Sequence, residues 1–265
     1  MSITWTAYRR ARRRSRQVWA LLLILAATLA AVLIWFFSSG QFELAEPTVA
    51  GPSQAPVYDP AWMKPVVPVL PVPEGHAGDV LEGLPVKGRA NSDNYERSAF
   101  GQAWQDVDRN GCDTRNDILR RDLAKVEYTQ GSACRVASGE LHEPYTGHRV
   151  EFRRGPESSK ALQIDHVVAL GDAWQKGAQQ LTAQQRQSLA NDPVNLIAVD
   201  GPENSEKGAG DAATWLPRNK AIRCHYVARQ ISVKASYQLW VTQAEKDAMK
   251  RVLASCPQQA TVRPG

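Results

Sequence analysis

The N-terminal part of the sequence contains one uninterrupted apolar run, residues 18–37, which restricts what this part of the chain can form. The run carries no charge, and its 20 residues at helical rise span about 30 Å, the thickness of the hydrocarbon core of a bilayer. Trp19 and Trp35 lie near its ends, as in the aromatic belts of membrane proteins. We therefore predict a transmembrane signal-anchor. A cleaved signal peptide, cut near Gly40 to give a secreted product, is the alternative, although its apolar region is usually only about 7–15 residues long.

Positive charge is concentrated before this run. Residues 1–17 contain six arginines and no acidic residue, a formal charge of +6. Such a segment predicts a cytoplasmic N-terminus, with the rest of the chain on the outer side of the cell membrane. Because the whole chain carries only +5, residues 18–265 come to about −1. The basic pI therefore reflects the N-terminal segment and is no evidence for a fold that binds polyanions.

Proline dominates the segment that follows the apolar run. The nine prolines between residues 41 and 85 exclude helix interiors and central strands, and they favour extended, polyproline-like structure. Such a segment is typical of a semi-rigid spacer. We predict five parts, a basic cytoplasmic segment, a membrane anchor, a Pro-rich linker, a globular domain and a tail: residues 1–17, 18–37, 38–85, 86–258 and 259–265.

Four cysteines lie in the part of the chain predicted to be exported, where oxidising surroundings favour disulfides. Three pairings are possible for Cys112, Cys134, Cys224 and Cys256. Nearness in sequence favours Cys112–Cys134 and Cys224–Cys256. A zinc site is the alternative, but the sequence has no C-x-x-C spacing to support it.

The pattern of apolar residues predicts an α+β domain with more helix than strand and a few short antiparallel strands. Leu119, Leu123 and Val126 follow helical spacing, so a helix is expected over residues 116–125. Thr182 is placed to cap another helix. Strands are expected within residues 134–154, 161–168 and 195–199, and further helices over residues 169–178, 182–190, 204–213, 217–235 and 242–254.

The most specific chemical pattern is an acid and a histidine, Asp165 and His166, at the end of a short apolar run. Neighbouring strand residues point to opposite faces, so the two side chains have different roles. Asn195, Asn204 and Lys207 follow downstream. Histidine activates water near neutral pH, and Mg²⁺ needs only one or two protein oxygen ligands. This is the layout expected of a single-metal phosphodiesterase site.

Further motifs surround these residues: Asp165-His166-Val167-Val168, Gly177-Ala178, Ala190-Asn191-Asp192-Pro193-Val194-Asn195-Leu196, Asn204-x-x-Lys207, Trp215-Leu216-Pro217 and, upstream, Cys134-x-x-x-Ser138-Gly139 and Tyr145-Thr146-Gly147. In this order they resemble the HNH, or ββα-metal, endonuclease superfamily. More narrowly, residues 108–255 resemble the C-terminal domain of GmrSD-type restriction endonucleases, which is also found in exported bacterial proteins. The resemblance implies an HNH ββα-metal core within the α+β domain.

Roles for single residues follow from the resemblance. His166 matches the general base, and Asp165 and Asn204 match the metal ligands. Asn195 matches an asparagine that ties the loop together and orients the histidine. Lys207, one turn after Asn204, is expected to contact a phosphate. Many HNH enzymes have histidine at the last metal position, and the asparagine here favours Mg²⁺ or Mn²⁺. A purely structural Asp-His pair, a structural Asn195 and a solvated Lys207 are the alternatives.

Other residues are weaker candidates for binding substrate. Arg153, Arg154 and Lys160 precede the site and are placed to grip phosphates, although a solvated charged loop is equally consistent with the sequence. The tryptophans of the domain are expected to be core anchors rather than base-stacking platforms: Trp104, Trp174, Trp215 and Trp240.

We therefore predict a metal-dependent endonuclease that hydrolyses DNA, with RNA as a second substrate, outside the membrane and with little sequence specificity. The alternative is a non-catalytic cell-envelope domain that keeps the same scaffold for binding. A metallopeptidase is disfavoured because the sequence contains no H-E-x-x-H motif.

Overall fold

The computed structural model describes residue 28 and residues 71–155 and 158–263. Apart from the helical Thr28, the segment predicted to cross the membrane lies outside the described residues, and so does most of the Pro-rich linker. No helix in the described part of the chain is long and apolar enough to span a membrane. The predicted fold class is corrected accordingly: the described residues form an α+β fold in which no helix is long and apolar enough to span a membrane.

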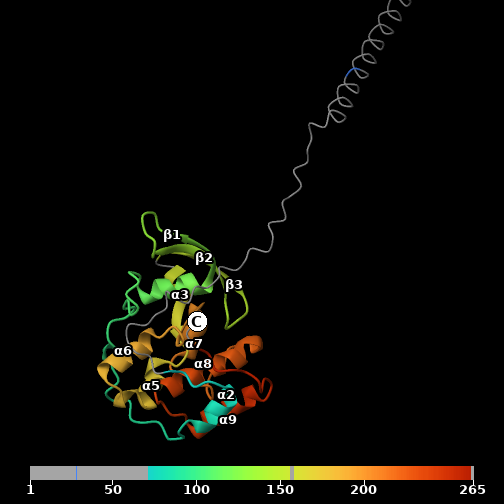
Figure 1. Cartoon of the computed structure of the whole chain (residues 1–265). Helices are drawn as coiled ribbons and strands as arrows, with labels where there is room; N and C mark the ends of the chain where they lie inside the picture. Colours follow the sequence, from blue (N-terminus) through green and yellow to red (C-terminus); the bar gives the residue numbers. More distant parts are fainter. Residues whose placement is uncertain (1–27, 29–70, 156–157, 264–265) are drawn as a thin grey trace, which may run out of the picture. The chain divides into compact units, whose positions relative to one another are not determined.

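The described residues from 71 onward form short helices and short strands (Figure 1). The α-helices are α2 (Ala77–Gly83), α3 (Thr114–Asp122), α4 (Ser158–Ala161), α5 (Leu170–Gln175), α6 (Ala183–Asn191), α7 (Gly201–Lys207), α8 (Arg223–Ser236) and α9 (Gln243–Leu253). The strands are β1 (Leu123–Tyr128), β2 (Val136–His142), β3 (Arg149–Arg153), β4 (Leu162–His166) and β5 (Leu196–Asp200). Three 3-10 helices are η2 (Arg97–Phe100), η3 (Ala178–Gln180) and η4 (Lys220–Ile222).

Strands β1, β2 and β3 form an antiparallel sheet at one end of the domain, and α2, α8 and α9 lie at the other end (Figure 1). The turn between β2 and β3 contains Gly147 at φ 82°, a conformation that favours glycine. The strands predicted within residues 134–154 are therefore confirmed. The helix predicted over residues 116–125 is partly wrong, because α3 ends at Asp122 and Leu123 begins β1, where it pairs with Leu141.

Strands β4 and β5 pair antiparallel between these two ends of the domain, and α7 follows β5 directly. Asp200 caps α7 by accepting a hydrogen bond from the Glu203 amide at 3.0 Å. Position 201 requires glycine, since a Cβ there would collide with the Lys160 carbonyl oxygen. Two strands and a helix are the arrangement that the resemblance implies, and the end of β4 carries Asp165 and His166.

The residues between β4 and β5 fold into α5, η3 and α6. Thr182 caps α6 in a capping box with Gln185, as the sequence predicts. Leu170, Ala173 and Leu189 of this insert are buried against residues of α8 and the loop that follows it, including Val233 and Leu239. Val168, two residues after the end of β4, is buried in the same cluster, so the insert packs this end of the strand against α8.

The first and the last residues of the described domain are hydrogen-bonded to each other. The Ala77 amide donates to the Gln259 carbonyl at 2.8 Å, and the Thr261 amide donates to the Gly75 carbonyl at 3.0 Å. Leu81 of α2 is fully buried in the core formed with α8 and α9. The packed part of the chain therefore begins before residue 86, where the sequence places the start of the domain.

Both disulfides pair as nearness in sequence suggests. Cys112–Cys134 joins the loop before α3 to the start of β2, with Cα atoms 5.2 Å apart. Cys224–Cys256 joins the start of α8 to the chain after α9, with Cα atoms 6.4 Å apart. The expected connectivity is confirmed.

A loop of acidic residues next to the first disulfide gives the domain an expected pH response. Burial, together with the charges of the nearby Asp108, Asp106 and Asp113, raises the pKa of Asp117 to about 6. In the unfolded protein the pKa of an aspartate is about 3.9. Because the pKa is higher in the folded protein, the group stabilises the fold below pH 4, and this contribution to stability is lost as the pH rises through 6. We expect Asp117→Asn to raise the free energy of unfolding at pH 7 by roughly 1–2 kcal/mol, allowing for solvent screening. Urea unfolding at pH 4 and pH 7 measures this, and an equal effect at both pH values would contradict it.

Candidate functional site

Two cavities meet at the end of β4. The first, of about 260 Å³, is called the aromatic cavity, and its walls include Phe100, Trp104, His166 and Leu170. The second, of about 290 Å³, is called the Asp165 cavity, and its walls include Asp165, His166 and Asn204. Arg97 and His166 border both cavities. The site predicted from the sequence therefore opens on one side into an apolar space that no motif had indicated.

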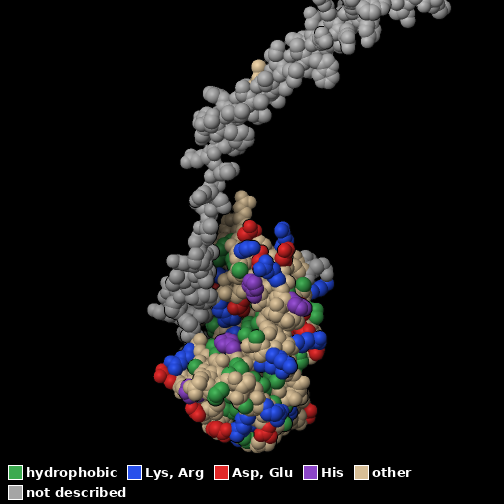
Figure 2. All heavy atoms as spheres, turned by 90° about the vertical axis from the view of Figure 1, so that its right-hand side faces the viewer, with side chains coloured by type: hydrophobic (Ala, Val, Ile, Leu, Met, Phe, Trp, Pro, Cys, Tyr) green, Lys and Arg blue, Asp and Glu red, His purple; other side chains and the backbone are tan. Residues whose placement is uncertain are grey.

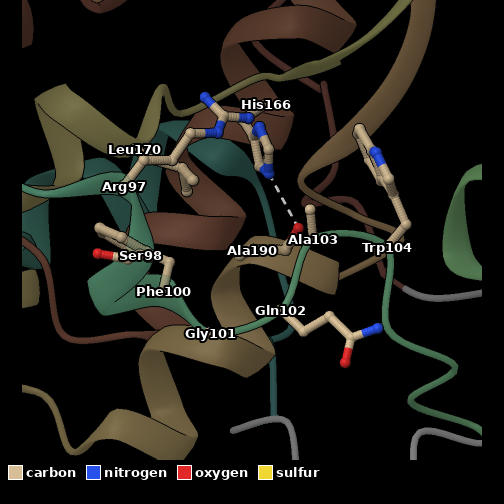
Figure 3. Close-up of a pocket in the computed structure, with 10 residues that line it drawn as sticks. All are labelled: Arg97, Ser98, Phe100, Gly101, Gln102, Ala103, Trp104, His166, Leu170 and Ala190. Atoms are coloured by element: carbon tan, nitrogen blue, oxygen red, sulfur yellow. Dashed lines mark hydrogen bonds between the residues drawn. The ribbon is translucent and has the colours of Figure 1, made fainter.

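His166 is held as a neutral imidazole. Its Nε2 lies 2.9 Å from the Ala190 carbonyl oxygen, and because a carbonyl only accepts, Nε2 must carry the hydrogen (Figure 3). Burial lowers the pKa of His166 to about 4, so the ring is uncharged at neutral pH. The lone pair is therefore on Nδ1, which makes no hydrogen bond with the described residues. This is the form of histidine that accepts a proton from water.

Two residues that the sequence does not single out as functional flank the imidazole. The Trp104 ring lies nearly parallel to it, with centroids 6.3 Å apart and an interplanar angle of 17°. The Arg97 side chain reaches toward His166 from η2 (Figure 3), and its charge contributes to the lowered pKa of the histidine. Both residues lie before the matched motifs. Trp104 is half-buried: it packs against the core cluster around α3 and also lines the cavity.

Asp165 is buried beside His166, and both of its carboxylate oxygens are engaged. The Tyr145 hydroxyl donates to Oδ2 at 2.6 Å, and the Lys207 ammonium donates to Oδ1 at 2.9 Å. Burial and the charge of Asp165 raise the pKa of Tyr145 well above its usual value, so that the phenol stays a hydrogen-bond donor. Tyr145 belongs to the Tyr-Thr-Gly turn, which the sequence indicates only as a turn.

Lys207 does not present its charge to the cavities. Its side chain is 0% exposed, and besides Asp165 its ammonium donates to the His166 carbonyl oxygen at 2.9 Å. Lys207 thus holds the acid and the backbone of the histidine together. This contact differs from the phosphate contact that the resemblance implies.

Asn204 lies on α7 and faces the same cavity as Asp165. Its Nδ2 donates to the Gln163 Oε1 at 2.8 Å, which leaves the amide oxygen as the atom directed to other ligands. A carboxylate and an amide oxygen on one cavity fit the sparse oxygen set of Mg²⁺ or Mn²⁺, whose other ligands are water and phosphate oxygens. No group of three His, Cys, Asp or Glu side chains that could hold a metal is present among the described residues. Because Lys207 also binds Asp165, we expect such an ion to bind weakly without substrate.

Asn195 acts on the loop around the site rather than on the histidine ring. The side chain is fully buried; its Oδ1 accepts from the Val168 amide at 2.8 Å, and its Nδ2 donates to the Leu189 carbonyl at 3.1 Å. It thereby ties the chain after β4 to the end of α6, next to Ala190, the residue that holds His166. The arrangement gives Asn195 a positioning role.

The three basic residues proposed from the sequence do not line either cavity. Arg154 donates to the Val136 carbonyl and to Asn116, each at 2.6 Å. Arg153 is exposed at the end of β3, and Lys160 is exposed on α4. Figure 2 shows Lys and Arg interspersed with Asp and Glu over the face in view, without a patch of one sign.

Comparison with known proteins gives two matches. The family model of the GmrSD restriction endonucleases, C-terminal domain, matches residues 113–252. An uncharacterized secreted protein of Arthroderma benhamiae is 38% identical over 182 residues, which cover 68% of this chain and 84% of the relative. No solved structure matches the chain significantly.

Proposed function

Because the chain belongs to the family of the GmrSD restriction endonuclease C-terminal domain, we propose that it is a metal-dependent endonuclease that hydrolyses phosphodiester bonds. DNA is the proposed substrate, with RNA as a second one, and cleavage is proposed to depend little on sequence. The observation that carries this proposal is the neutral His166, with its unprotonated Nδ1, beside Asp165 and Asn204 on one cavity.

The proposed reaction assigns one step to each group. Nδ1 of His166 accepts a proton from water as the water oxygen bonds to phosphorus and the bond to the leaving oxygen breaks. The Ala190 carbonyl keeps Nε2 protonated and stabilises the imidazolium that forms. Asp165 and Asn204 would hold a divalent cation, which when bound neutralises the phosphoryl and leaving oxygens. Lys207 and Tyr145 fix the Asp165 carboxylate.

The proposed setting is outside the cytoplasm, as a secreted protein. The relative from Arthroderma benhamiae is named a secreted protein, and disulfides form and persist in oxidising compartments.

The metal requirement can be tested with purified, oxidised protein and plasmid DNA. We expect nicking with Mg²⁺ or Mn²⁺ and none with EDTA. Asp165→Asn and Asn204→Ala should shift the metal concentration for half-maximal cleavage upward by about tenfold or more, since each removes or weakens one ligand. Asn94→Ala, an exposed asparagine that lines neither cavity, is the matched control.

The same experiment separates the nuclease from a non-catalytic binding domain. Such a domain would bind its ligand equally well in EDTA and would leave the plasmid intact with either metal. Absence of nicking with both metals, in protein whose disulfides are formed, would contradict the proposed function.

A further inference from the structure

One wall of the aromatic cavity is built by a segment that lies outside the region of the family match. Residues 89–104 run across the domain before α3, and the match begins only at residue 113. The segment is tethered at several points: Arg89 pairs with Asp172 at 3.0 Å, and the Ala99 carbonyl accepts from Arg186 at 2.9 Å. The cavity wall that it forms is therefore a fixed part of the fold.

The walls of the aromatic cavity have the composition of a stacking site. Phe100, Trp104, Ala103, Leu170 and Ala190 supply apolar surface, and Gln102 and Ser98 supply polar groups at the rim. At about 260 Å³ the cavity is smaller than the roughly 300–1,000 Å³ of pockets for drug-sized ligands, so it suits one planar ring system. Trp104 has φ 58°, which is an unfavourable backbone conformation for a bulky residue. Strained conformations of this kind cluster at functional sites.

Arg97 gives the cavity its charge. The side chain is exposed and borders both cavities, and its guanidinium makes no hydrogen bond or ion pair with the described residues. The ammonium of Lys207, by contrast, is already paired with the Asp165 carboxylate. An unpaired guanidinium between a proposed hydrolytic centre and an aromatic wall is complementary to a phosphate that carries a nucleoside.

From these observations we propose that the aromatic cavity binds one nucleobase of the substrate. The base stacks against Trp104. Arg97 binds the phosphate group between this nucleoside and the position at which His166 acts. The inference rests on the proposed nuclease function and adds a base-binding subsite to it. Because every base has an aromatic face, the subsite tolerates any sequence.

The test uses the whole chain and short oligonucleotides in which one position at a time is abasic. For the wild type we expect kcat/KM to fall about tenfold when the base next to the cleaved bond is missing. Trp104→Ala should lower kcat/KM for the intact oligonucleotide by a similar factor and lose the dependence on that base, whereas Trp104→Phe keeps it. A purely structural role of Trp104 would lower cleavage of intact and abasic oligonucleotides equally, and that result would overturn the proposal.

Arg97 is tested separately. Arg97→Ala should weaken binding of intact and abasic oligonucleotides alike and reduce the salt dependence of binding by about one counterion. Arg251→Ala, an exposed arginine of α9 that borders neither cavity, is the matched control. Equal behaviour of the two variants would remove Arg97 from the subsite.

A binding measurement keeps the subsite distinct from the nuclease activity. Fluorescence anisotropy with His166→Gln compares intact with abasic oligonucleotides without cleavage. Suppose that the wild type shows no cleavage, and that the abasic oligonucleotide binds about tenfold more weakly than the intact one. The nuclease proposal then fails and the subsite stands. Equal binding of the two oligonucleotides overturns the subsite whether or not the wild type cleaves.

Discussion

Replacement of His166 by alanine is expected to lower the rate of phosphodiester cleavage by about 10²–10⁴-fold, the usual contribution of a positioned general base. The reason is specific to the geometry: Nε2 is committed to the Ala190 carbonyl, and Nδ1 is the only ring atom left to take a proton. Binding of Mn²⁺ should be largely retained, because Asp165 and Asn204 are unchanged. Single-turnover cleavage, with Mn²⁺ binding followed by calorimetry, measures both quantities.

His148→Ala is the matched control for this variant. His148 is exposed in the turn between β2 and β3 and borders neither cavity. Its replacement should leave the rate within about twofold, as expected for surface positions. If His166→Ala retained wild-type rates, or lost metal binding as strongly as Asp165→Asn does, the division of roles between the acid and the histidine would be wrong.

Replacement of Lys207 by methionine is expected to lower the free energy of unfolding by about 3–5 kcal/mol. The ammonium is completely buried, and without it the buried Asp165 carboxylate keeps only the Tyr145 hydroxyl as a hydrogen-bond donor. An uncompensated charge of this kind is among the costliest changes in a protein interior. Urea unfolding of the oxidised protein measures the loss.

Two further variants show whether the loss comes from the unpaired charge. The double variant Lys207→Met with Asp165→Asn removes both charges and should recover most of the stability. Lys250→Met removes an exposed lysine of α9 that pairs with Glu82, and we expect a change within about 0.5 kcal/mol. A loss in the double variant as large as in Lys207→Met alone would mean that the packing of the lysine, not its charge, is what matters.

The sequence predicts the elements that carry the site because their signals are local. Thr182 caps α6 through a side-chain contact within one turn, and Asp165 and His166 end an apolar run that forms β4. The helix predicted through Leu123 is wrong for a different reason. Leu119 and Leu123 are four residues apart, which satisfies helical spacing, but pairing of Leu123 with Leu141 of β2 draws the chain into a strand.

The contacts that complete the site are not local, and so the sequence does not predict them. Lys207 follows Asn204 at helical spacing, yet its burial depends on the packing of Tyr145 and Asp165 around it. Trp104 lies more than 60 residues before His166 in a segment without periodicity, and its left-handed backbone conformation leaves no trace in composition. The predicted role of Trp104 as a core anchor follows from residue type alone.

The pairing of residues 75–77 with residues 259–261 means that the described domain starts and finishes at the same point on its surface. A domain with adjoining ends can be carried in a loop of another protein, or have its old ends joined and new ones opened elsewhere, without stretching the chain. A circular permutant that joins residue 263 to residue 71 and opens between Gln130 and Gly131, in the exposed turn between β1 and β2, should therefore fold around an unaltered His166.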